Sequence, residues 1–337
     1  MKAKLLLLAF TISCYQVFTQ DLIAVQNGGD PIFYEDLSEA IKKSVTGDTL
    51  FVPAKNYVVN DTIRKELHII GEGYDLTNNL GATILSSKNN TTPMLVLEEG
   101  ASNGSITGIR FSVNKSGVYS RNIFSVTELN NYLIDRCFLS LHLYASNSLV
   151  KNCILSNTTI QAKITSVLSN NILVGNGYAL SKCSIRNNIF LVMSDRYNSL
   201  NPNECNIDNN IFPPNYRIWY PVNCSLRNNL NISLNGVSGD NFGSSNFDSD
   251  LVLNETFINY TQLNGIDNNS ANFQLIANSS FKNAGTDGTD LGIYGGRFPW
   301  KDGSAPFNPQ IIFSEIPGTT DENGVLKIRI EVEAQKN

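Results

Sequence analysis

Hydrophobic and polar positions repeat together through the middle of the chain. Six windows of eight residues align without gaps, and they are YLIDRCFL (132–139), SLVKNCIL (148–155), SVLSNNIL (166–173), CSIRNNIF (183–190), CNIDNNIF (205–212) and CSLRNNLN (224–231). The third position is always aliphatic and the seventh always apolar, and the window starts lie 16 to 22 residues apart. A unit this short cannot bury its own apolar face, so we expect successive units to stack and share one core.

The residue types within the windows favour strands over helices. A four-residue spacing of apolar positions also suits a helix, but Asn, Ser and Cys are weak helix formers and β-branched residues favour extended backbone. The Asn-Asn pair at the fifth and sixth positions indicates a sharp bend, because Asn tolerates the left-handed region. Leucine-rich repeats, the alternative stacked architecture, need an LxxLxL frame that the windows lack. We therefore predict a parallel β-helix with coils about 4.8 Å apart.

In a parallel stack the equivalent residues of successive coils lie above one another, so each aligned position becomes a column. The sixth position predicts a ladder of side-chain hydrogen bonds, formed by Cys137, Cys153, Asn171, Asn188, Asn210 and Asn229. The first position predicts buried thiols at Cys183, Cys205 and Cys224. A zinc site would need four close ligands, and the chain has neither a CxxC motif nor a histidine beside these cysteines.

Charge nearly alternates at the fourth position of the windows. Its residues are Asp135, Lys151, Ser169, Arg186, Asp208 and Arg227. Opposite charges on neighbouring strands of an outward face form cross-strand pairs worth about 0.2 to 1 kcal/mol each. A catalytic cluster of Arg and Asp is the alternative, but functional residues usually interrupt a repeat, whereas these follow it. We therefore expect structural ion pairs.

The first twenty residues have the pattern of an export signal. Lys2 and Lys4 precede an apolar run that is too short to cross a membrane, so we predict a signal peptide over residues 1–19. Lipidation at Cys14 is the alternative. Cleavage removes two lysines and no acids, which changes the net charge from 25 − 30 = −5 to 23 − 30 = −7 and argues against a nucleic-acid partner. No second apolar run reaches membrane length, so we expect a protein that is secreted, on the cell surface or periplasmic, without a transmembrane segment.

Both ends of the predicted β-helix, residues 20–300, carry distinct segments. Asp36-Leu-Ser-Glu39 resembles a capping box and predicts a short amphipathic helix that covers the first coil. The turn-rich stretch 273–300 is expected to close the body at the far end. Residues 301–337 form a C-terminal extension, in which GVLKIRIEVEAQ (324–335) alternates as an edge strand does. This strand either pairs back onto the β-helix or covers its open end.

Two of these segments resemble a known family. GDTLFVPAKNY (47–57) is similar to the first coil of pectin-lyase-like right-handed parallel β-helix proteins, and NAGTDGTDLGIYGG (283–296) is similar to the closing motif of secreted bacterial members. Asn56 departs from the family pattern, which usually has Gly there. The resemblance implies an all-β, right-handed solenoid. It leaves the activity open, because the family includes polysaccharide lyases, glycoside hydrolases, epimerases, adhesins and members with no assigned reaction.

The catalytic motifs of the enzymatic members are missing from the sequence. It contains no Asn-Thr-Asp, Asp-Asp or Gly-His-Gly motif of the polygalacturonase type, and no Arg-x-Pro-x-x-Arg motif of the pectate-lyase type. His68 and His142 are far apart in sequence, and we expect each to be a strand residue rather than a general base. We therefore favour a protein that binds polysaccharide, or serves as a structural or adhesive element, without catalysis. A polysaccharide lyase or glycoside hydrolase that acts on an acidic glycan is the alternative.

Aromatic and arginine residues in the loops of two adjacent coils indicate a glycan-binding surface. Its candidate residues are Arg196, Tyr197, Tyr216, Arg217, Trp219 and Tyr220. Arginine forks match the carboxylates of uronic acids, and flat aromatic rings stack on sugar faces. The alternative is that Trp219 and Tyr220 pack beneath a loop as buried anchors.

Acidic residues in the C-terminal half are weak candidates for a calcium site. They are Asp287 and Asp290, and also Asp240, Asp248 and Asp250. Neither group has the spacing of an EF-hand loop, and turn formation explains Asp beside Gly equally well. Calcium is therefore the one cofactor that the sequence leaves open.

Overall fold

The protein is described by a computed structural model. The described residues are 22–76, 81–88, 93–112, 123–156, 159–163, 165–174, 178–191, 200–213, 216–235, 239–247, 256–259, 272–301, 310–315 and 324–333. The predicted signal peptide, residues 1–19, lies outside these ranges.

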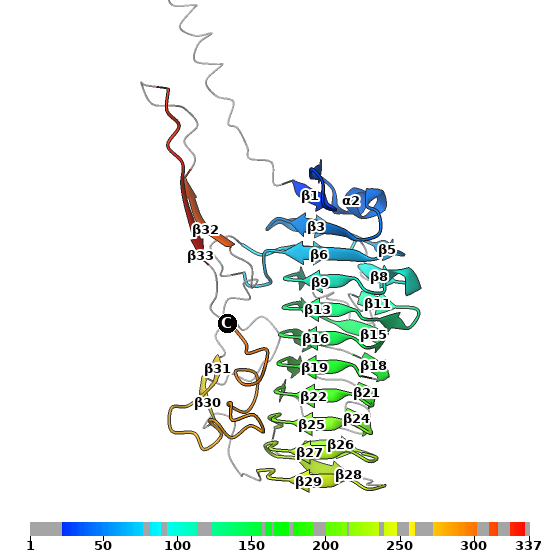
Figure 1. Ribbon diagram of the computed structural model, residues 1–337, viewed down its shortest axis with the longest axis vertical. Helices are drawn as coiled ribbons and strands as arrows, with labels where there is room; N and C mark the ends of the chain where they lie inside the picture. Colours follow the sequence, from blue (N-terminus) through cyan, green and yellow to red (C-terminus); the bar gives the residue numbers. More distant parts are fainter. Residues whose placement is uncertain are drawn as a thin grey trace, which may run out of the picture.

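Three largely parallel sheets stack their strands along one axis and form a right-handed β-helix (Figure 1). Sheet A has twelve strands, which are β2 (Ile32–Tyr34), β1 (Ile23–Gln26), β3 (Asp48–Val52), β6 (Leu67–Gly71), β9 (Ser105–Thr107), β13 (Leu133–Asp135), β16 (Leu149–Lys151), β19 (Val167–Ser169), β22 (Ser184–Arg186), β25 (Asn206–Asp208), β27 (Ser225–Arg227) and β29 (Phe242–Ser244). Sheet B has seven, which are β23 (Ile189–Phe190), β20 (Ile172–Val174), β17 (Ile154–Ser156), β14 (Phe138–Leu139), β10 (Arg110–Phe111), β7 (Ile84–Ser86) and β4 (Asn56–Val58). Sheet C has eight, which are β24 (Leu200–Asn203), β21 (Tyr178–Ser181), β18 (Thr159–Lys163), β15 (Leu141–Ser146), β11 (Ile123–Ser125), β8 (Leu95–Leu97), β5 (Asp61–Ile63) and β12 (Leu129–Asn130).

The pairing register between coils matches the alignment of the sequence windows. Ile185, Ile207 and Leu226, all third positions, are successive partners in sheet A. Positions two to four of a window form a strand of sheet A, and the seventh and eighth positions begin sheet B, as in β22 and β23. The predicted sequence of strand, bend and strand is therefore confirmed, and so is the parallel β-helix.

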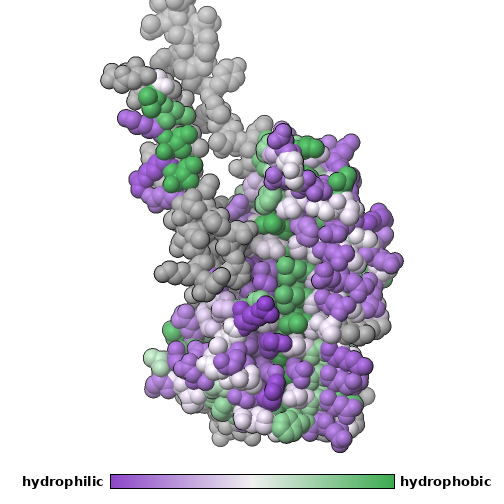
Figure 2. Space-filling view, viewed as in Figure 1, coloured by the Kyte–Doolittle hydropathy of each residue, from purple (hydrophilic) through white to green (hydrophobic). Residues whose placement is uncertain are grey.

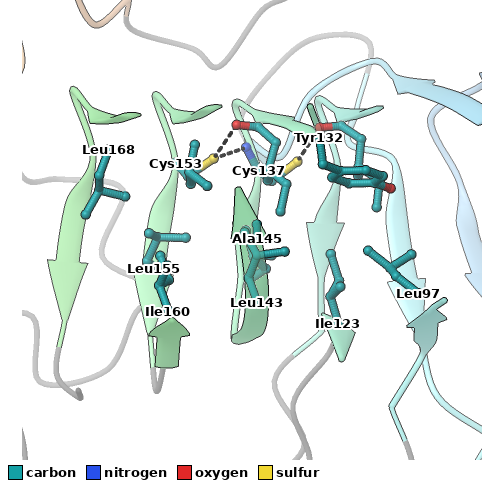
Figure 3. Packing of buried hydrophobic residues seen from close by; sticks show 14 of the residues in the cluster. Leu97, Ile123, Tyr132, Cys137, Leu143, Ala145, Cys153, Leu155, Ile160 and Leu168 are labelled. Atoms are coloured by element: carbon teal, nitrogen blue, oxygen red, sulfur yellow. Dashed lines mark hydrogen bonds between the residues drawn. The ribbon is translucent and has the colours of Figure 1, made fainter. Parts of the chain in front are cut away.

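The interior of the solenoid is a continuous apolar core. The third positions of all six windows and the eighth positions of the first five are buried in it, together with inward residues of sheet C such as Leu143 and Leu200. Figure 3 shows buried side chains of successive coils following one another along the axis. The rings of Phe190 and Phe212 stack with centroids 4.6 Å apart. Like side chains therefore lie over like side chains, as stacking of a repeated unit requires.

The predicted ladder at the sixth position is present and is one coil longer than expected. Each step joins a backbone N–H to the side chain of the next coil: Cys153 to Asn171, Asn171 to Asn188, Asn188 to Asn210, and Asn210 to Asn229, at 2.9 to 3.0 Å. Asn229 then donates to Asn246, which lies beyond the last sequence window. Side-chain amides also bond to one another along the column, so these buried polar groups satisfy each other.

The fifth position of each window turns the chain from sheet A into sheet B. Its residues have φ angles from 50° to 61°, and they are Arg136, Asn152, Asn170, Asn187, Asn209 and Asn228. The left-handed conformation costs Asn less than most residues, because its short polar side chain bonds locally. The predicted sharp bend is confirmed, and it explains why Asn dominates this position.

The seventh position packs outside the solenoid, in a second apolar core. Ile172, Ile189, Ile211 and Leu230 supply its inner wall. Residues from the C-terminal part of the chain supply the outer wall, and they are Phe257, Phe273, Leu275, Phe281, Leu291 and Ile293. Phe257 and Phe273 belong to a small antiparallel pair, β30 (Phe257–Asn259) and β31 (Asn272–Leu275). The invariant apolar character of this position therefore comes from the cover that the chain lays over it.

Residues 284–295, here called the flank segment, run back along the solenoid over this second core. Asn228 Nδ2 donates to the carbonyl of Ala284, and Asn170 Nδ2 donates to the carbonyls of Ile293 and Gly295, at 2.6 to 2.8 Å. The asparagines between them, Asn187 and Asn209, bond to the middle of the segment. The expectation that residues 273–300 close the far end is therefore corrected, because this stretch lies along the side of the body.

The predicted capping helix is present as α2 (Leu37–Lys43). Asp36 caps it by accepting a hydrogen bond from the Glu39 N–H at 2.8 Å, and Leu37, Ala40 and Ile41 are buried. The helix follows β1 and β2, and β1 pairs antiparallel with β3. The first parallel strand of sheet A is thus covered by an antiparallel pair as well as by a helix, which blunts an edge that would otherwise invite aggregation.

The C-terminal extension contains a hairpin of β32 (Gln310–Glu315) and β33 (Arg329–Glu333). The edge strand predicted within 324–335 is confirmed as β33, and its partner is β32 rather than the β-helix. In Figure 1 the hairpin, drawn in red, stands clear of the sheets. None of the described helices is long and apolar enough to cross a membrane.

Candidate functional site

An irregular coil interrupts the repeat beside sheet C. Its strand β26 (Arg217–Trp219) pairs with β28 (Ser233–Asn235) and follows β24 in the stack. Asn203 and Val222 bridge the two coils, and Leu200 and Ile218 are both fully buried. Three residue steps separate Leu200 from Asn203 (203 − 200), but four separate Ile218 from Val222 (222 − 218). Counted from the buried residue to the bridge, this coil has one residue more than the preceding coil, and we call this irregularity the bulge, because an extra residue in a strand re-aims the side chains beside it.

Tyr220 lies at this bulge in a conformation that costs free energy. Its φ angle is 49°, in the left-handed region, and its side chain is 50% exposed. A residue with a Cβ loses roughly 1 to 2 kcal/mol in that region, and Asn is the usual exception. Strained residues of this kind cluster at binding and catalytic sites. The bulge thus holds a large aromatic ring toward solvent at a cost to stability.

Trp219 lies beside Tyr220 and is anchored at one edge. The two ring centroids are 5.9 Å apart and the ring planes are tilted by 52°. The indole Nε1 is buried and has no hydrogen-bond partner among the described residues, while the side chain as a whole is partly exposed. The two hypotheses for this pair, a sugar-stacking surface and a buried anchor, therefore apply to different residues: Trp219 is a partial anchor and Tyr220 is the exposed ring.

Tyr216 does not belong to this surface, which corrects the sequence prediction for that residue. Its side chain is only 3% exposed, and its ring lies against Phe212 and Phe190 with centroids 5.0 and 5.3 Å apart. Burial raises the pKa of its hydroxyl above the ordinary value. An aromatic residue directly before β26 is consistent with an interior position as well as with an exposed one, so the residue type alone could not separate the two cases.

The arginine part of the predicted surface is only partly described. The backbone of Arg217 lies in β26, where it pairs with Ser233 of β28. Arg196 and Tyr197 lie outside the described residues. Carboxylate recognition by Arg196 and Arg217 therefore stays a prediction.

The two preceding coils present a strip of exposed residues on the outer side of sheet C. Ala179 and Asn201 are register partners in β21 and β24, and both are exposed. Lys182 and Glu204 follow on the same two coils and form an exposed ion pair with N to O at 3.6 Å. The exposed positions of these two coils therefore carry a small residue, an amide and an ion pair.

The fourth-position column forms ion pairs as predicted. Lys151 Nζ lies 3.0 Å from Asp135 Oδ2, and Arg227 makes two hydrogen bonds to Asp208, at 3.0 and 2.9 Å. The first pair is buried and the second partly exposed. Hydrogen bonding to Asp208 raises the pKa of Arg227. These residues therefore link neighbouring coils.

Aromatic and cationic contacts hold the chain that follows the flank segment, and one of them uses Lys151 of the fourth-position column. Lys151 Nζ lies 4.9 Å from the centre of the Phe298 ring, and the Arg110 guanidinium lies 4.3 Å from that of Phe138. The ring of Trp300 lies 6.4 Å from that of Tyr74. The contacts of Phe298 and Trp300 fix the chain after residue 295 to earlier coils, and the contact of Arg110 with Phe138 joins two of those coils to each other.

The calcium candidates within the described residues serve turns. Asp287 accepts hydrogen bonds from the N–H and hydroxyl of Thr289, and Asp290 accepts one from the N–H of Asn283. Asp240 is exposed, and Asp248 and Asp250 lie outside the described residues. No group of three or more His, Cys, Asp or Glu among the residues described here is arranged to hold a metal ion. The local bonds of Asp287 and Asp290 account for their presence in this stretch.

The thiols and histidines have structural positions. The five described cysteines are free and buried, as predicted for the first-position thiols. Hydrogen bonding between Cys183 and Cys205 lowers the pKa of Cys183 and raises the pKa of Cys205 to about 11. His68 lies in β6 and bonds to Ser105, and His142 lies in β15. Both histidines are strand residues, as expected.

The chain matches no protein-family model and no curated protein. Among solved structures it is similar to the catalytic domain of a GH87 alpha-1,3-glucanase variant in complex with tetrasaccharides, with 12% sequence identity and a TM-score of 0.35. The match covers 57% of this chain and 51% of that one, so the chain spans about half the length of that structure. A likeness this distant identifies neither a family nor an activity.

Proposed function

We propose that the protein is a secreted or cell-surface β-helix of the pectin-lyase-like type that binds polysaccharide without catalysis. The observation that carries the proposal is the exposed ring of Tyr220, held in a left-handed conformation next to Trp219 at a bulge in the repeat. Aromatic rings stack on the apolar faces of sugars, and strain of this kind persists where the surrounding structure enforces it.

The shape of the neighbouring surface supports a linear ligand. Ala179 and Asn201 are exposed register partners on two neighbouring coils, and neither has a bulky side chain. A polymer can therefore contact several coils at once, and many weak contacts add up to useful affinity. Because the catalytic motifs of the enzymatic pectin-lyase-like proteins are missing, binding rather than turnover is the function that these residues support best.

The test is binding of the mature chain to a glycan array that contains neutral and uronate-rich polysaccharides. We expect binding that Tyr220→Ala abolishes and Trp219→Ala weakens. Phe51→Ala is the matched control, because Phe51 is also an exposed aromatic residue but lies in β3 of sheet A. If Tyr220→Ala binds as well as the wild type, the bulge is not the binding site.

Charge recognition is tested in the same assay. Arg217→Ala and Arg196→Ala should reduce binding to uronate-rich polysaccharides more than binding to neutral ones, because guanidinium groups pair with carboxylates. Equal losses for both classes of ligand would contradict a role for these arginines in reading charge.

A second candidate function, cleavage of an acidic glycan, is favoured by Glu72. This residue lies in the loop after β6 and is partly buried, and burial raises the pKa of its carboxyl group. An upward shift of the pKa is the direction that favours a carboxyl group as a general acid. Release of unsaturated uronate or of reducing ends from acidic polysaccharides would reveal turnover. Turnover that Glu72→Gln abolishes and the exposed control Glu35→Gln preserves would favour the enzyme over the binding protein.

A further inference from the structure

The C-terminal hairpin is a two-stranded sheet with an open edge. β32 pairs with β33 through partners from Gln310 with Glu333 to Glu315 with Arg329. On its other side β33 has no strand beside it among the described parts of the chain. An isolated two-stranded hairpin is at best marginally stable in water, and an open edge is a template for pairing with another strand.

The hairpin also exposes apolar side chains on one side of β33 and the residues that lead into it. Ile328 is 52% exposed and Ile330 is 50% exposed, and Leu326 is exposed as well. Figure 2 shows hydrophobic residues, in green, facing solvent along this hairpin. Arg329 and Glu331 alternate with these residues and form an ion pair with each other. The strand therefore has an apolar face and a charged face, as a strand of a larger sheet does.

The sequence KIRIEVE (327–333) complements itself when it is paired with a reversed copy. Centred on Ile330, an antiparallel pair places Lys327 opposite Glu333, Arg329 opposite Glu331, and Ile328 opposite Val332. All charged pairs are then of opposite sign, and the aliphatic residues of both copies share one face.

The register of this pairing is specified by charge. A slip of two residues in one direction places Glu331 opposite Glu331, and a slip of two in the other direction places Arg329 opposite Arg329. A slip of one residue sets the charged face of one copy against the apolar face of the other. The register centred on Ile330 is the one that avoids both penalties.

We propose that β33 pairs antiparallel with β33 of a second copy of this chain, centred on Ile330, so that two hairpins form one four-stranded sheet. Such a contact has two-fold symmetry, in which the same strand serves both copies. It satisfies the open edge of β33 and gathers Ile328 and Ile330 of each copy on one face. Because the contact is small, the dimer is weak and its population depends on protein concentration.

The test is sedimentation of the full mature chain over a concentration series. The wild type should shift from monomer to dimer. Arg329→Glu and Glu331→Arg should each weaken the dimer about tenfold, because each places like charges opposite one another twice by symmetry. The double variant Arg329→Glu/Glu331→Arg should restore the dimer.

Mixing the two single variants gives the sharpest outcome. One copy then carries acids at both positions and the other carries bases, so a heterodimer should form although neither variant pairs with itself. Lys182→Glu, a charge reversal at an exposed site on the solenoid, is the matched control and should leave the dimer unchanged. Circular dichroism and thermal melting of each variant check that the solenoid is folded.

Two results would overturn the proposal. A wild type that stays monomeric throughout the series would mean that another partner, and not a second copy, covers the hairpin. Single variants that dimerise as strongly as the wild type, or a mixture that gains no heterodimer, would place any dimer contact elsewhere on the molecule.

Discussion

The flank of the solenoid under residues 284–295 and the open face of sheet C differ in how they use the repeat. On the flank, Asn170 and Asn228 hold the cover by equivalent hydrogen bonds at equivalent positions. On the open face, the coil of Trp219 and Tyr220 adds a residue and loses the regular register. On the flank, regular columns of equivalent residues stack the coils and hold residues 284–295 over them. The open face shows that the exposed aromatic ring arises where the column is broken.

The two asparagines of each Asn-Asn pair also differ in role, because one faces the interior of the solenoid and the other faces the flank segment. The sixth-position residue Asn210 lies inside and bonds to Asn188 and Asn229 of the neighbouring coils. The fifth-position residue Asn209 takes the left-handed conformation and bonds outward to Thr286. One residue type therefore serves two columns for different reasons, an inner ladder and an outer clamp.

The largest expected effect is at the inner ladder. Asn210→Leu keeps the branching and the number of heavy atoms of the side chain but removes the bonds of Nδ2 to the Ile185 carbonyl and of Oδ1 to the Asn188 N–H, both at 2.9 Å. The variant should lose about 3 to 5 kcal/mol of unfolding free energy, because buried polar groups on both neighbours are left without partners. Urea unfolding measures the loss. A loss below about 1 kcal/mol would contradict the ladder's role in stability.

The next prediction compares a substitution in the inner core with one in the second core. Ile189→Ala, at a seventh position, and Ile185→Ala, at a third position, each remove a fully buried side chain and should each cost about 2 to 4 kcal/mol. Only Ile189→Ala should speed hydrogen exchange in residues 284–295, because only Ile189 packs against the cover. Equal exchange in that segment for both variants would mean that the flank and the interior unfold as one unit.

A smaller effect is expected where one clamp is removed. Asn170→Ala loses the bonds of Nδ2 to the Ile293 and Gly295 carbonyls and should cost about 1 to 3 kcal/mol. Asn170→Gly is the control, because it loses the same bonds but suits the left-handed backbone. Thermal melting of both variants separates the clamp from the bend. If Asn170→Gly is as stable as the wild type, the outer bonds add nothing.

The sequence was sufficient for those features that depend on stacking alone. The ladder from Asn171 to Asn229 and the pair of Arg227 with Asp208 follow from alignment, because equivalent residues of a parallel stack must be neighbours. The outward direction of the seventh position was not predictable, because an apolar residue at a fixed offset is consistent with either side of the chain. Its direction became clear from the residues that cover Ile189.

The candidate site was predictable only in part, for a related reason. Trp219 and Tyr220 were identified by residue type, but the bulge that exposes Tyr220 depends on counting residues against the preceding coil. Tyr216 was grouped with them because it is close in sequence, although its ring packs on Phe212 inside. The residue types thus indicate where the irregular coil lies. Its alignment with the preceding coil is needed to tell which of its aromatic residues are buried and which are exposed.

The smallest effect on stability is expected at Tyr220 on the open face. Substitutions there should change the free energy of unfolding little, although they abolish polysaccharide binding. Tyr220→Gly relieves the left-handed strain but frees the unfolded backbone, so it should unfold within about 0.5 kcal/mol of the wild type. Tyr220→Ala keeps the strain and should be about 1 kcal/mol less stable than Tyr220→Gly. Both variants lose the ring and should lose polysaccharide binding. Equal stability of the two variants in urea unfolding would show that the bulge does not hold residue 220 in the left-handed region, and the strain would then no longer argue for a binding site.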